Sequence, residues 1–103
     1  MKLNVIIFKN LKIGVYTTPQ FIDNEPDKAA IQLERSLTLN YEKEYDKIKQ
    51  YEHLQMYDLG TFDDVTGEVD FHKPVLLLDC REHMLNLKQV YLAKKEKEVE
   101  EHA

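Results

Sequence analysis

The thiol of Cys80 is the first group in this 103-residue chain that could do covalent chemistry. Cys80 stands between Asp79 and Arg81, with His83 three residues further on, a grouping that superficially suggests a nucleophile and its base. Side chains at this spacing near the end of a strand need not face one another, and no nucleophile elbow or oxyanion loop accompanies them. We therefore interpret Cys80 as a half-buried structural thiol. GxGxxG, P-loop and GxSxG patterns are absent as well, so we predict a protein that is not an enzyme and needs no cofactor.

Two further groups of side chains could bind metal. The adjacent acids Asp63 and Asp64 lack the additional oxygen ligands that Ca²⁺ or Mg²⁺ requires, and a turn held by an aspartate side chain explains them better. The histidines are scattered over the sequence without the spacing of a zinc site; they are His53, His72, His83 and His102. We predict no metal site.

The N-terminal segment offers binding chemistry of another kind. The chain has 14 basic and 19 acidic residues, a net charge of −5, but its first 22 residues carry three lysines and no acid. Proteins that bind single strands use cations to hold the phosphates and aromatic rings on which the bases stack. The predicted nucleic-acid site, which we expect at one end of the fold together with the amino terminus, comprises Lys2, Lys9, Lys12, Phe8 and Tyr16. The alternative is that Phe8 belongs to the core and that the lysines protect a sheet edge.

A second aromatic group lies between residues 41 and 57. Tyr41, Tyr45, Tyr51 and Tyr57 accompany three lysines, Lys43, Lys47 and Lys49. These side chains could form a nucleic-acid groove or a protein interface, where tyrosine is favoured. We favour a half-buried helix that packs on the sheet.

Hydrophobic periodicity predicts the elements that would position these groups. Residues 2–9 carry apolar side chains on both sides, which predicts a strand covered on both faces or at an interface. Residues 11–16 alternate as a half-buried strand, and the two are expected to form a tight hairpin around Lys9-Asn10. A helix follows from Asn24, a candidate N-cap, to about Thr38, with Pro26 in its first turn. Residues 41–52 are a second helix or an extension of the first.

The second half of the chain returns to strand periodicity. We predict a strand over 54–62 with a bulge at Gly60, a loop over 63–67 in which Gly67 supplies a positive φ, and strands at 68–71 and 75–78, the last one buried. A C-terminal helix begins at His83. The predicted fold class is α+β: one domain over 1–93, with an antiparallel sheet of about five strands, one or two inserted helices and a C-terminal helix, followed by a charged helical extension over 94–103.

The block from Leu54 to Gly67, which contains Leu59-Gly60, Phe62-Asp63-Asp64 and Thr66-Gly67, resembles the "LYxLGxFDDxTG" segment of one small phage family. The opening Met1-Lys2-Leu3 and the later Leu11-Lys12 resemble the same family. It is the small nonstructural protein of gokushoviruses and related microviruses, which are phages with single-stranded DNA genomes. The resemblance covers about residues 1–22 and 51–79; Tyr51-Glu52-His53 and the charged stretch from Lys88 depart from it. It implies a DNA-associated factor in viral genome replication, at the change to single-strand production for packaging, and it transfers no catalytic residues.

These observations predict a non-enzymatic phage accessory protein that binds single-stranded DNA. The alternative is an acidic, dimeric interaction module that docks on a replication, host or capsid protein without touching DNA. Apolar strands in so short a chain favour a homodimer. The longest apolar stretch is too short to span a membrane and the start lacks the features of a secretory signal, so we expect no membrane partner and a location in the host cytoplasm.

Overall fold

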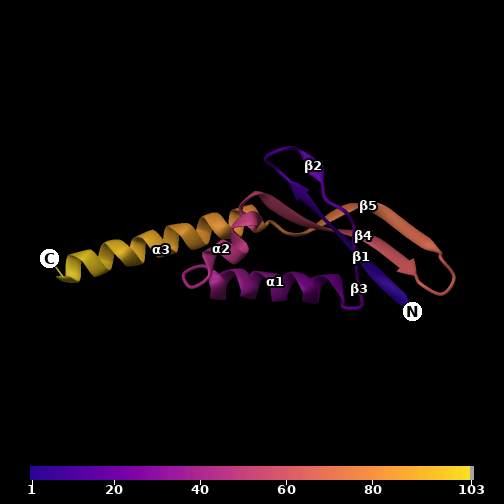
Figure 1. The fold of residues 1–103 in the computed structure, drawn as a ribbon, viewed down its shortest axis with the longest axis horizontal. Helices are drawn as coiled ribbons and strands as arrows, with labels where there is room; N and C mark the ends of the chain where they lie inside the picture. Colours follow the sequence, from indigo (N-terminus) through magenta and orange to yellow (C-terminus); the bar gives the residue numbers. More distant parts are fainter. Residues whose placement is uncertain (103) are drawn as a thin grey trace.

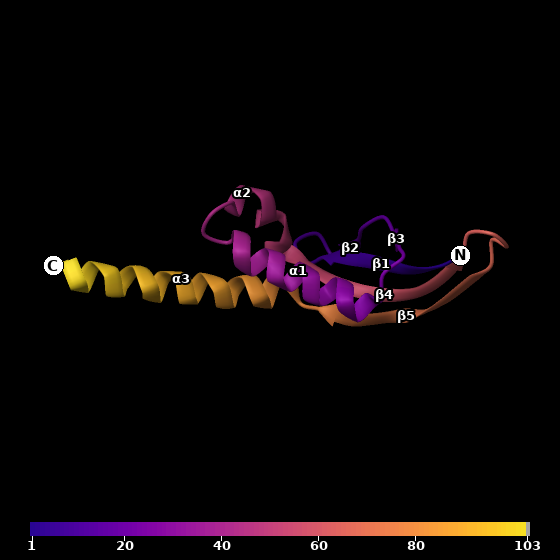
Figure 2. The same cartoon turned by 90° about the horizontal axis from the view of Figure 1, so that it is seen from below.

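Five antiparallel strands form one sheet in the computed structural model, which describes residues 1–102 and their side chains as far as Val99. The strands are β1 (Lys2–Asn10), β2 (Val15–Tyr16), β3 (Gln20–Ile22), β4 (Leu54–Asp63) and β5 (Val69–Leu78). Their order is β2-β1-β4-β5, and β3 pairs with β1 on the edge that β2 also uses. In Figure 2, β4 and β5 curve together as one long hairpin.

Three helices lie between β3 and β4 in the sequence, and the last helix follows β5. They are α1 (Pro26–Asn40), α2 (Tyr45–Ile48), the 3₁₀ helix η1 (Lys49–His53) and α3 (Cys80–His102). Figure 1 shows α1 running alongside the sheet and α3 leading away from it, which stretches the molecule to 65 × 27 × 20 Å. The predicted α+β class, with an antiparallel sheet, inserted helices and a C-terminal helix, is confirmed.

The predicted strands differ from the observed ones in three places. Residues 11–14 are a turn, because the Asn10 side chain accepts a hydrogen bond from the Lys12 backbone N–H at 3.0 Å and Gly14 adopts φ +72°. Residues 20–22 form β3, which the sequence pattern did not indicate. The strands predicted at 68–71 and 75–78 are one strand, β5, in which Pro74 is tolerated because β5 lies at the sheet edge. The expected burial of 75–78 is wrong for Val75 and Leu76, which are about half exposed.

The helix boundaries also shift. Residues 41–52 hold most of the two short helices α2 and η1, and α1 ends at Asn40, two residues beyond the predicted Thr38. The position before Pro26, Glu25, is the N-cap of α1, one residue later than predicted. The last helix begins at Cys80 and not at His83, because the Asp79 side chain accepts a hydrogen bond from the Glu82 backbone N–H at 3.1 Å and so caps the first turn.

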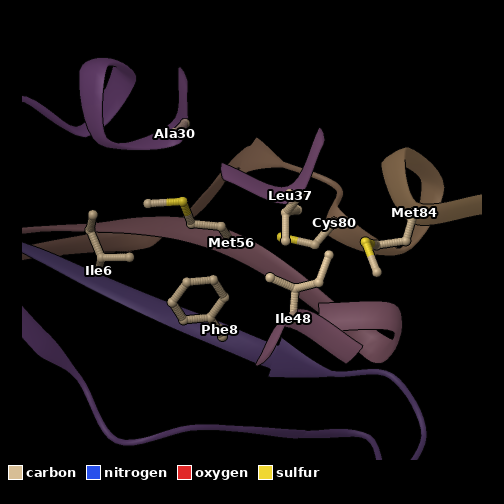
Figure 3. Close-up of a cluster of buried hydrophobic side chains, with 8 residues drawn as sticks. All are labelled: Ile6, Phe8, Ala30, Leu37, Ile48, Met56, Cys80 and Met84. Atoms are coloured by element: carbon tan, nitrogen blue, oxygen red, sulfur yellow. The ribbon is translucent and has the colours of Figure 1, made fainter. Parts of the chain in front are cut away.

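The core lies between one face of the sheet and the helices. Ile6 and Phe8 of β1 and Met56 of β4 pack against residues from all three α-helices (Figure 3). The helix residues in this cluster are Ala30 and Leu37 of α1, Ile48 of α2, and Cys80 and Met84 of α3. Leu37 and Cys80 are fully buried. This packing fixes the start of α3 against the end of the sheet.

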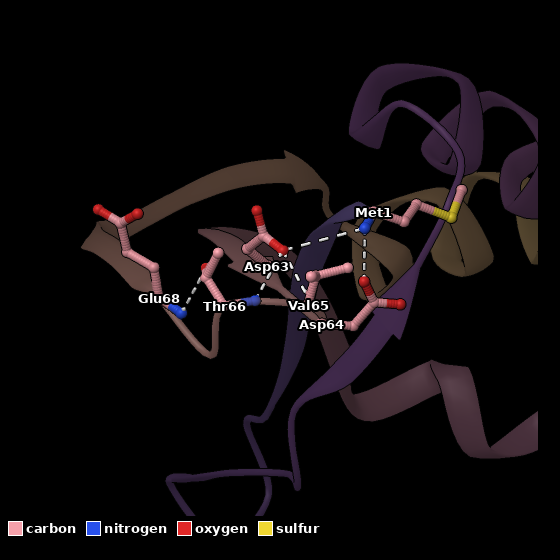
Figure 4. Close-up of polar contacts among 6 residues, drawn as sticks. All are labelled: Met1, Asp63, Asp64, Val65, Thr66 and Glu68. Atoms are coloured by element: carbon pink, nitrogen blue, oxygen red, sulfur yellow. Dashed lines mark hydrogen bonds and ion pairs between the residues drawn. The ribbon is translucent and has the colours of Figure 1, made fainter.

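The β4–β5 turn has the chemistry that its sequence predicts (Figure 4). Asp63 Oδ1 accepts hydrogen bonds from the backbone N–H groups of Val65 at 2.9 Å and Thr66 at 3.3 Å, which is an Asx turn. Gly67 has φ +76°, the left-handed conformation that glycine adopts without strain. The expected bulge at Gly60 is also present, because the pairing registers on both neighbouring strands shift there.

Candidate nucleic-acid interface

The three lysines of the predicted site lie in three different places. Lys2 is opposite Asp63 at one end of β1, and Lys9 is opposite Gln55 and Tyr16 near the other end. Seven residue steps along a strand span roughly 23 Å. Lys12 belongs to the β1–β2 turn beyond the strand. The expectation that these lysines and the amino terminus share one end of the fold is therefore wrong.

Acidic side chains already surround the Lys2 end of the strand. The amino group of Met1 lies 2.6 Å from Asp64 Oδ1 and 3.9 Å from Asp63 Oδ1 (Figure 4). The hydrogen bond to Asp64 raises the pKa of the amino group. The pKa of Asp63 is lowered, first by the backbone N–H groups of Val65 and Thr66 and then by nearby positive charge. This end is thus internally neutralised and offers little attraction for phosphate.

The ring of Phe8 is part of the core. Phe8 is 8% exposed, and its ring packs edge-on against that of Tyr51, with the ring centroids 6.0 Å apart. Phe8 therefore presents no face on which a base could stack in this structure.

The sheet face opposite the core carries a series of aromatic and aliphatic side chains, which we call the open face. Cross-strand partners share a face, so the register assigns its members. They are Leu3, Val5, Ile7 and Lys9 of β1, Tyr16 of β2, Phe21 of β3, Tyr57 and Phe62 of β4, and Val69, Phe71 and Leu76 of β5. Tyr16, Phe21 and Phe71 are each about half exposed. Beneath the rings, Val5 and Ile7 are buried, which makes the aromatic layer a supported surface.

Lys9, Tyr16 and Tyr57 form a cluster at one end of the open face. The Lys9 ammonium lies 5.6 Å from the centre of the Tyr16 ring, a cation–π contact. Tyr16 in turn packs edge-on against Tyr57, with the centroids 5.9 Å apart. A cation and two adjacent rings, one of them 47% exposed, are thereby held together on the surface of the sheet.

Hydrogen bonds fix the orientation of Tyr57 within this cluster. The Tyr57 hydroxyl donates to Gln55 Oε1 at 2.7 Å, and Gln55 Nε2 donates to Asp79 Oδ2 at 3.0 Å. Burial raises the pKa of Tyr57, with smaller contributions from Tyr16 and Asp79. The hydroxyl therefore stays protonated and remains a donor near neutral pH. The same Asp79 caps α3, so the helix start and the ring cluster are tied to one carboxylate.

A cleft of about 430 Å³ lies at the same end of the molecule, on the helix side. It is walled by the β1–β2 turn, the chain from the end of α1 to η1, and the first turns of α3. The lining residues are Leu11, Lys12, Tyr41, Tyr45, Glu52, His53, Arg81, Met84, Leu85 and Lys88. The backbone N–H of Leu11 donates to the carbonyl oxygen of His53 at 2.7 Å, which fixes the turn that carries Lys12 against η1.

Sequence inspection missed the basic character of this cleft. Lys12 lies about 70 residues before Arg81 and Lys88 in the sequence, and only the fold brings it to them. Among the side chains that the structure describes, no carboxylate forms an ion pair with any of the three. The one available signal was the spacing of Arg81, Leu85 and Lys88, which places them on one side of a helix.

The structure does not bring Cys80 and His83 together as a nucleophile and its base. Cys80 is fully buried and not half-buried as predicted. Burial, followed by the charge of Asp79, raises the pKa of its thiol to about 12. The His83 ring lies 2.9 Å from the hydroxyl of Thr38, on α1, so His83 links two helices. Among the side chains that the structure describes, as far as Val99, no three metal-ligating groups gather at one point, and no helix in the described part of the chain is long and apolar enough to cross a bilayer.

Comparisons with family models, with curated proteins and with solved structures found no match to this chain. The fold places it in the α+β class, and the surface adds an aromatic sheet face and a basic cleft.

Proposed function

We propose that this protein is a non-enzymatic accessory factor that binds single-stranded DNA through the Lys9 end of its open face. The observation that carries the proposal is the contact of the Lys9 ammonium with the partly exposed Tyr16 ring, beside Tyr57. Single strands bind to surfaces that combine cations for the phosphates with rings for the bases. Of the residues predicted from the sequence, Lys9 and Tyr16 remain in this site, while Lys2, Phe8 and Lys12 lie elsewhere.

The geometry favours single strands over duplex. A base can stack on Tyr16 only if it is unpaired and turned out of its own stack, which costs a duplex several kcal/mol but a flexible strand little. The net charge of −5 also opposes wrapping by a duplex, whose charge density is higher. Binding is expected to be local, involving few phosphates.

The viral role comes from the resemblance of residues 54–67 to the microvirus protein. That segment forms β4 and its turn, and β4 contributes Tyr57 to the ring cluster. We infer a role in genome replication and packaging in the host cytoplasm, where single strands accumulate before they are encapsidated.

Fluorescence anisotropy with a labelled oligothymidylate of about 16 nucleotides tests the binding. Tyr16→Ala should weaken binding by about 5- to 150-fold, since stacking contributes about 1–3 kcal/mol per base, and Tyr16→Phe should retain most of the affinity. Lys9→Gln should weaken binding and reduce the salt dependence by about 0.7 in the logarithmic slope. Lys2→Gln, at the far end of the same strand, is the matched control and should change little. Binding that tolerates Tyr16→Ala and Lys9→Gln, or no binding at low salt, would overturn the proposal.

A second candidate is homodimerisation through β5, alone or as part of docking on a replication, host or capsid protein. The observation that favours it is the exposure of apolar residues on both faces of this edge strand: Val69, Phe71, Val75 and Leu76 are each 47–54% exposed. An exposed apolar edge strand is a template for pairing with another chain. Light scattering should then give twice the monomer mass of 12.2 kDa, and Phe71→Lys should restore the monomer. A monomer at every micromolar concentration would reject this candidate.

A further inference from the structure

We propose that the cleft between the β1–β2 turn and α3 binds a nucleoside phosphate, with the phosphate held by Lys12, Arg81 and Lys88. The inference concerns a site separate from the open face and shares no residue with it, so it does not depend on the proposed function. Its volume of about 430 Å³ falls within the usual range for small-ligand sites, which begins near 300 Å³.

The charges of the cleft indicate an anionic ligand. Three basic residues and a single acidic residue, Glu52, line the cleft, although the whole chain is acidic. Some surface lysines elsewhere in the protein form ion pairs with carboxylates, as Lys47 does with Glu44 at 3.0 Å and Lys94 with Glu42 at 3.5 Å. Lys12, Arg81 and Lys88 have no such partner among the described side chains. Their charge is therefore available to a phosphate, which arginine and lysine bind by charge-assisted hydrogen bonds.

The walls of the cleft favour an aromatic ring next to that phosphate. Tyr41 and Tyr45 meet edge-on at a centroid distance of 5.4 Å, and Tyr45 is 37% exposed. An edge-on pair leaves one ring face free, on which a base can stack. Met84 and Leu85 add apolar surface from α3. A simple phosphate would use none of these side chains.

Glu52 limits which bases suit the cleft. Glu52 is half-buried and forms no hydrogen bond with another described side chain. Its carboxylate lies near Tyr41, whose pKa is raised first by burial and then by the charge of Glu52. A carboxylate accepts hydrogen bonds and donates none, so it favours a base that bears an amino group. Cytosine meets this requirement, and thymine, with carbonyl oxygens at the corresponding edge, does not.

Nitrogen-15 NMR titration of the full chain tests the site with four probes: dCMP, dTMP, deoxycytidine and inorganic phosphate. We expect dCMP to shift the backbone signals of the cleft residues and to bind at least fivefold more tightly than each of the others. Arg81→Gln and Lys88→Gln should each weaken dCMP binding at least fivefold, and Glu52→Gln should bring the dCMP and dTMP affinities closer together. Lys97→Gln, an equal charge change on an exposed part of α3, is the control and should have no effect.

The nucleotide could be free or the end of a strand, and two more probes distinguish these sources. A tetranucleotide that begins with cytidine is titrated with and without a 5′-phosphate. Tenfold tighter binding of the phosphorylated strand than of dCMP identifies a strand end, and equal or weaker binding identifies the free nucleotide. The proposal is overturned if millimolar dCMP leaves the cleft signals unchanged, if inorganic phosphate binds as tightly as dCMP, or if the Arg81 and Lys88 variants bind normally. The two proposals can fail separately. The open-face test uses oligothymidylate, whose bases bear no amino group, with variants of Lys9 and Tyr16, whereas the cleft test uses dCMP with variants of Glu52, Arg81 and Lys88.

Discussion

Gly60 of β4 and Asp70 of β5 approach each other so closely that a Cβ atom on Gly60 would overlap the backbone carbonyl oxygen of Asp70. The same Cβ would lie 3.0 Å from the Cα atom of Phe71, and Gly60 also has φ +134°. The neighbours are backbone atoms, which cannot rotate away as a side chain could. The bulge at Gly60 thus joins β4 and β5 in a way that only glycine permits.

Gly60→Ala should therefore destabilise the protein far more than the same change at the turn glycine. Gly67 has φ +76° but open space around it, so Gly67→Ala should cost only the backbone strain of about 1–2 kcal/mol. That corresponds to a fall in melting temperature of about 4–8 °C per kcal/mol for a chain of this size. Thermal unfolding monitored by circular dichroism should show at least twice this fall for Gly60→Ala. Equal losses at the two positions would mean that β4 and β5 can separate without penalty.

Cys80 should be unreactive in the folded protein. It is 0% exposed, and its pKa is about 12, so the thiolate that attacks alkylating reagents is scarce at pH 8. Incubation with iodoacetamide at that pH should leave the native chain unmodified, and the same treatment in denaturant should label it completely. Mass spectrometry measures both. Rapid labelling of the native chain would show that α3 detaches from the sheet.

Stability should fall at alkaline pH. Burial raises the pKa of Cys80 from an ordinary value of 9.0 to about 12, and the pKa values of Tyr41 and Tyr57 are also raised. The unfolded chain therefore loses these protons at lower pH than the folded chain, so the stabilisation is complete below about pH 9 and is lost as the pH rises towards 12. Urea unfolding midpoints should decline across this interval, and Cys80→Ala should make the decline shallower. A midpoint independent of pH between 9 and 11 would contradict the burial of these groups.

Asp79 should stabilise the start of α3 through its oxygen atoms. Asp79→Ala removes the acceptor for the Glu82 N–H and the partner of Gln55, and loss of an N-cap costs about 1 kcal/mol. Asp79→Asn retains an acceptor oxygen and should lose less stability. Both variants can be compared by thermal unfolding. If asparagine were as harmful as alanine, the charge of Asp79 would matter more than its hydrogen bonds.

Truncation of the chain after Lys95 should leave its stability nearly unchanged. Val99, the only large apolar residue in the final charged segment, is 68% exposed, so this part of α3 buries little. The melting temperature should fall by no more than about 2 °C, a loss typical of changes to an exposed surface. A large loss would show that the extension packs against another chain, and light scattering would then show that the truncated protein contains fewer chains per particle than the full-length protein. The division at residue 93 stays a prediction.

The local elements could be predicted from the sequence, because their causes are local. Pro26 places the start of α1, the Asx turn at Asp63 and the positive φ of Gly67 close the β4–β5 hairpin, and alternation identifies β1 and β4. Leu37 of α1 and Met84 of α3, both core residues, lie at positions where helical periodicity repeats apolar side chains on one face. The α+β class follows from the order of these elements.

Which side chains meet could not be predicted, because it depends on how the whole chain packs. The sequence places Lys2, Lys9 and Lys12 close together, but an extended strand separates Lys2 from Lys9, and the turn directs Lys12 to the helix side. The reverse holds for Lys12, Arg81 and Lys88, which pairing of β4 and β5 and docking of α3 bring to one cleft. Strand register likewise decided that Phe8 faces the core while Tyr16 and Tyr57 share the open face. A shift of one residue in register would exchange the two faces, and such a choice depends on the packing of the whole sheet.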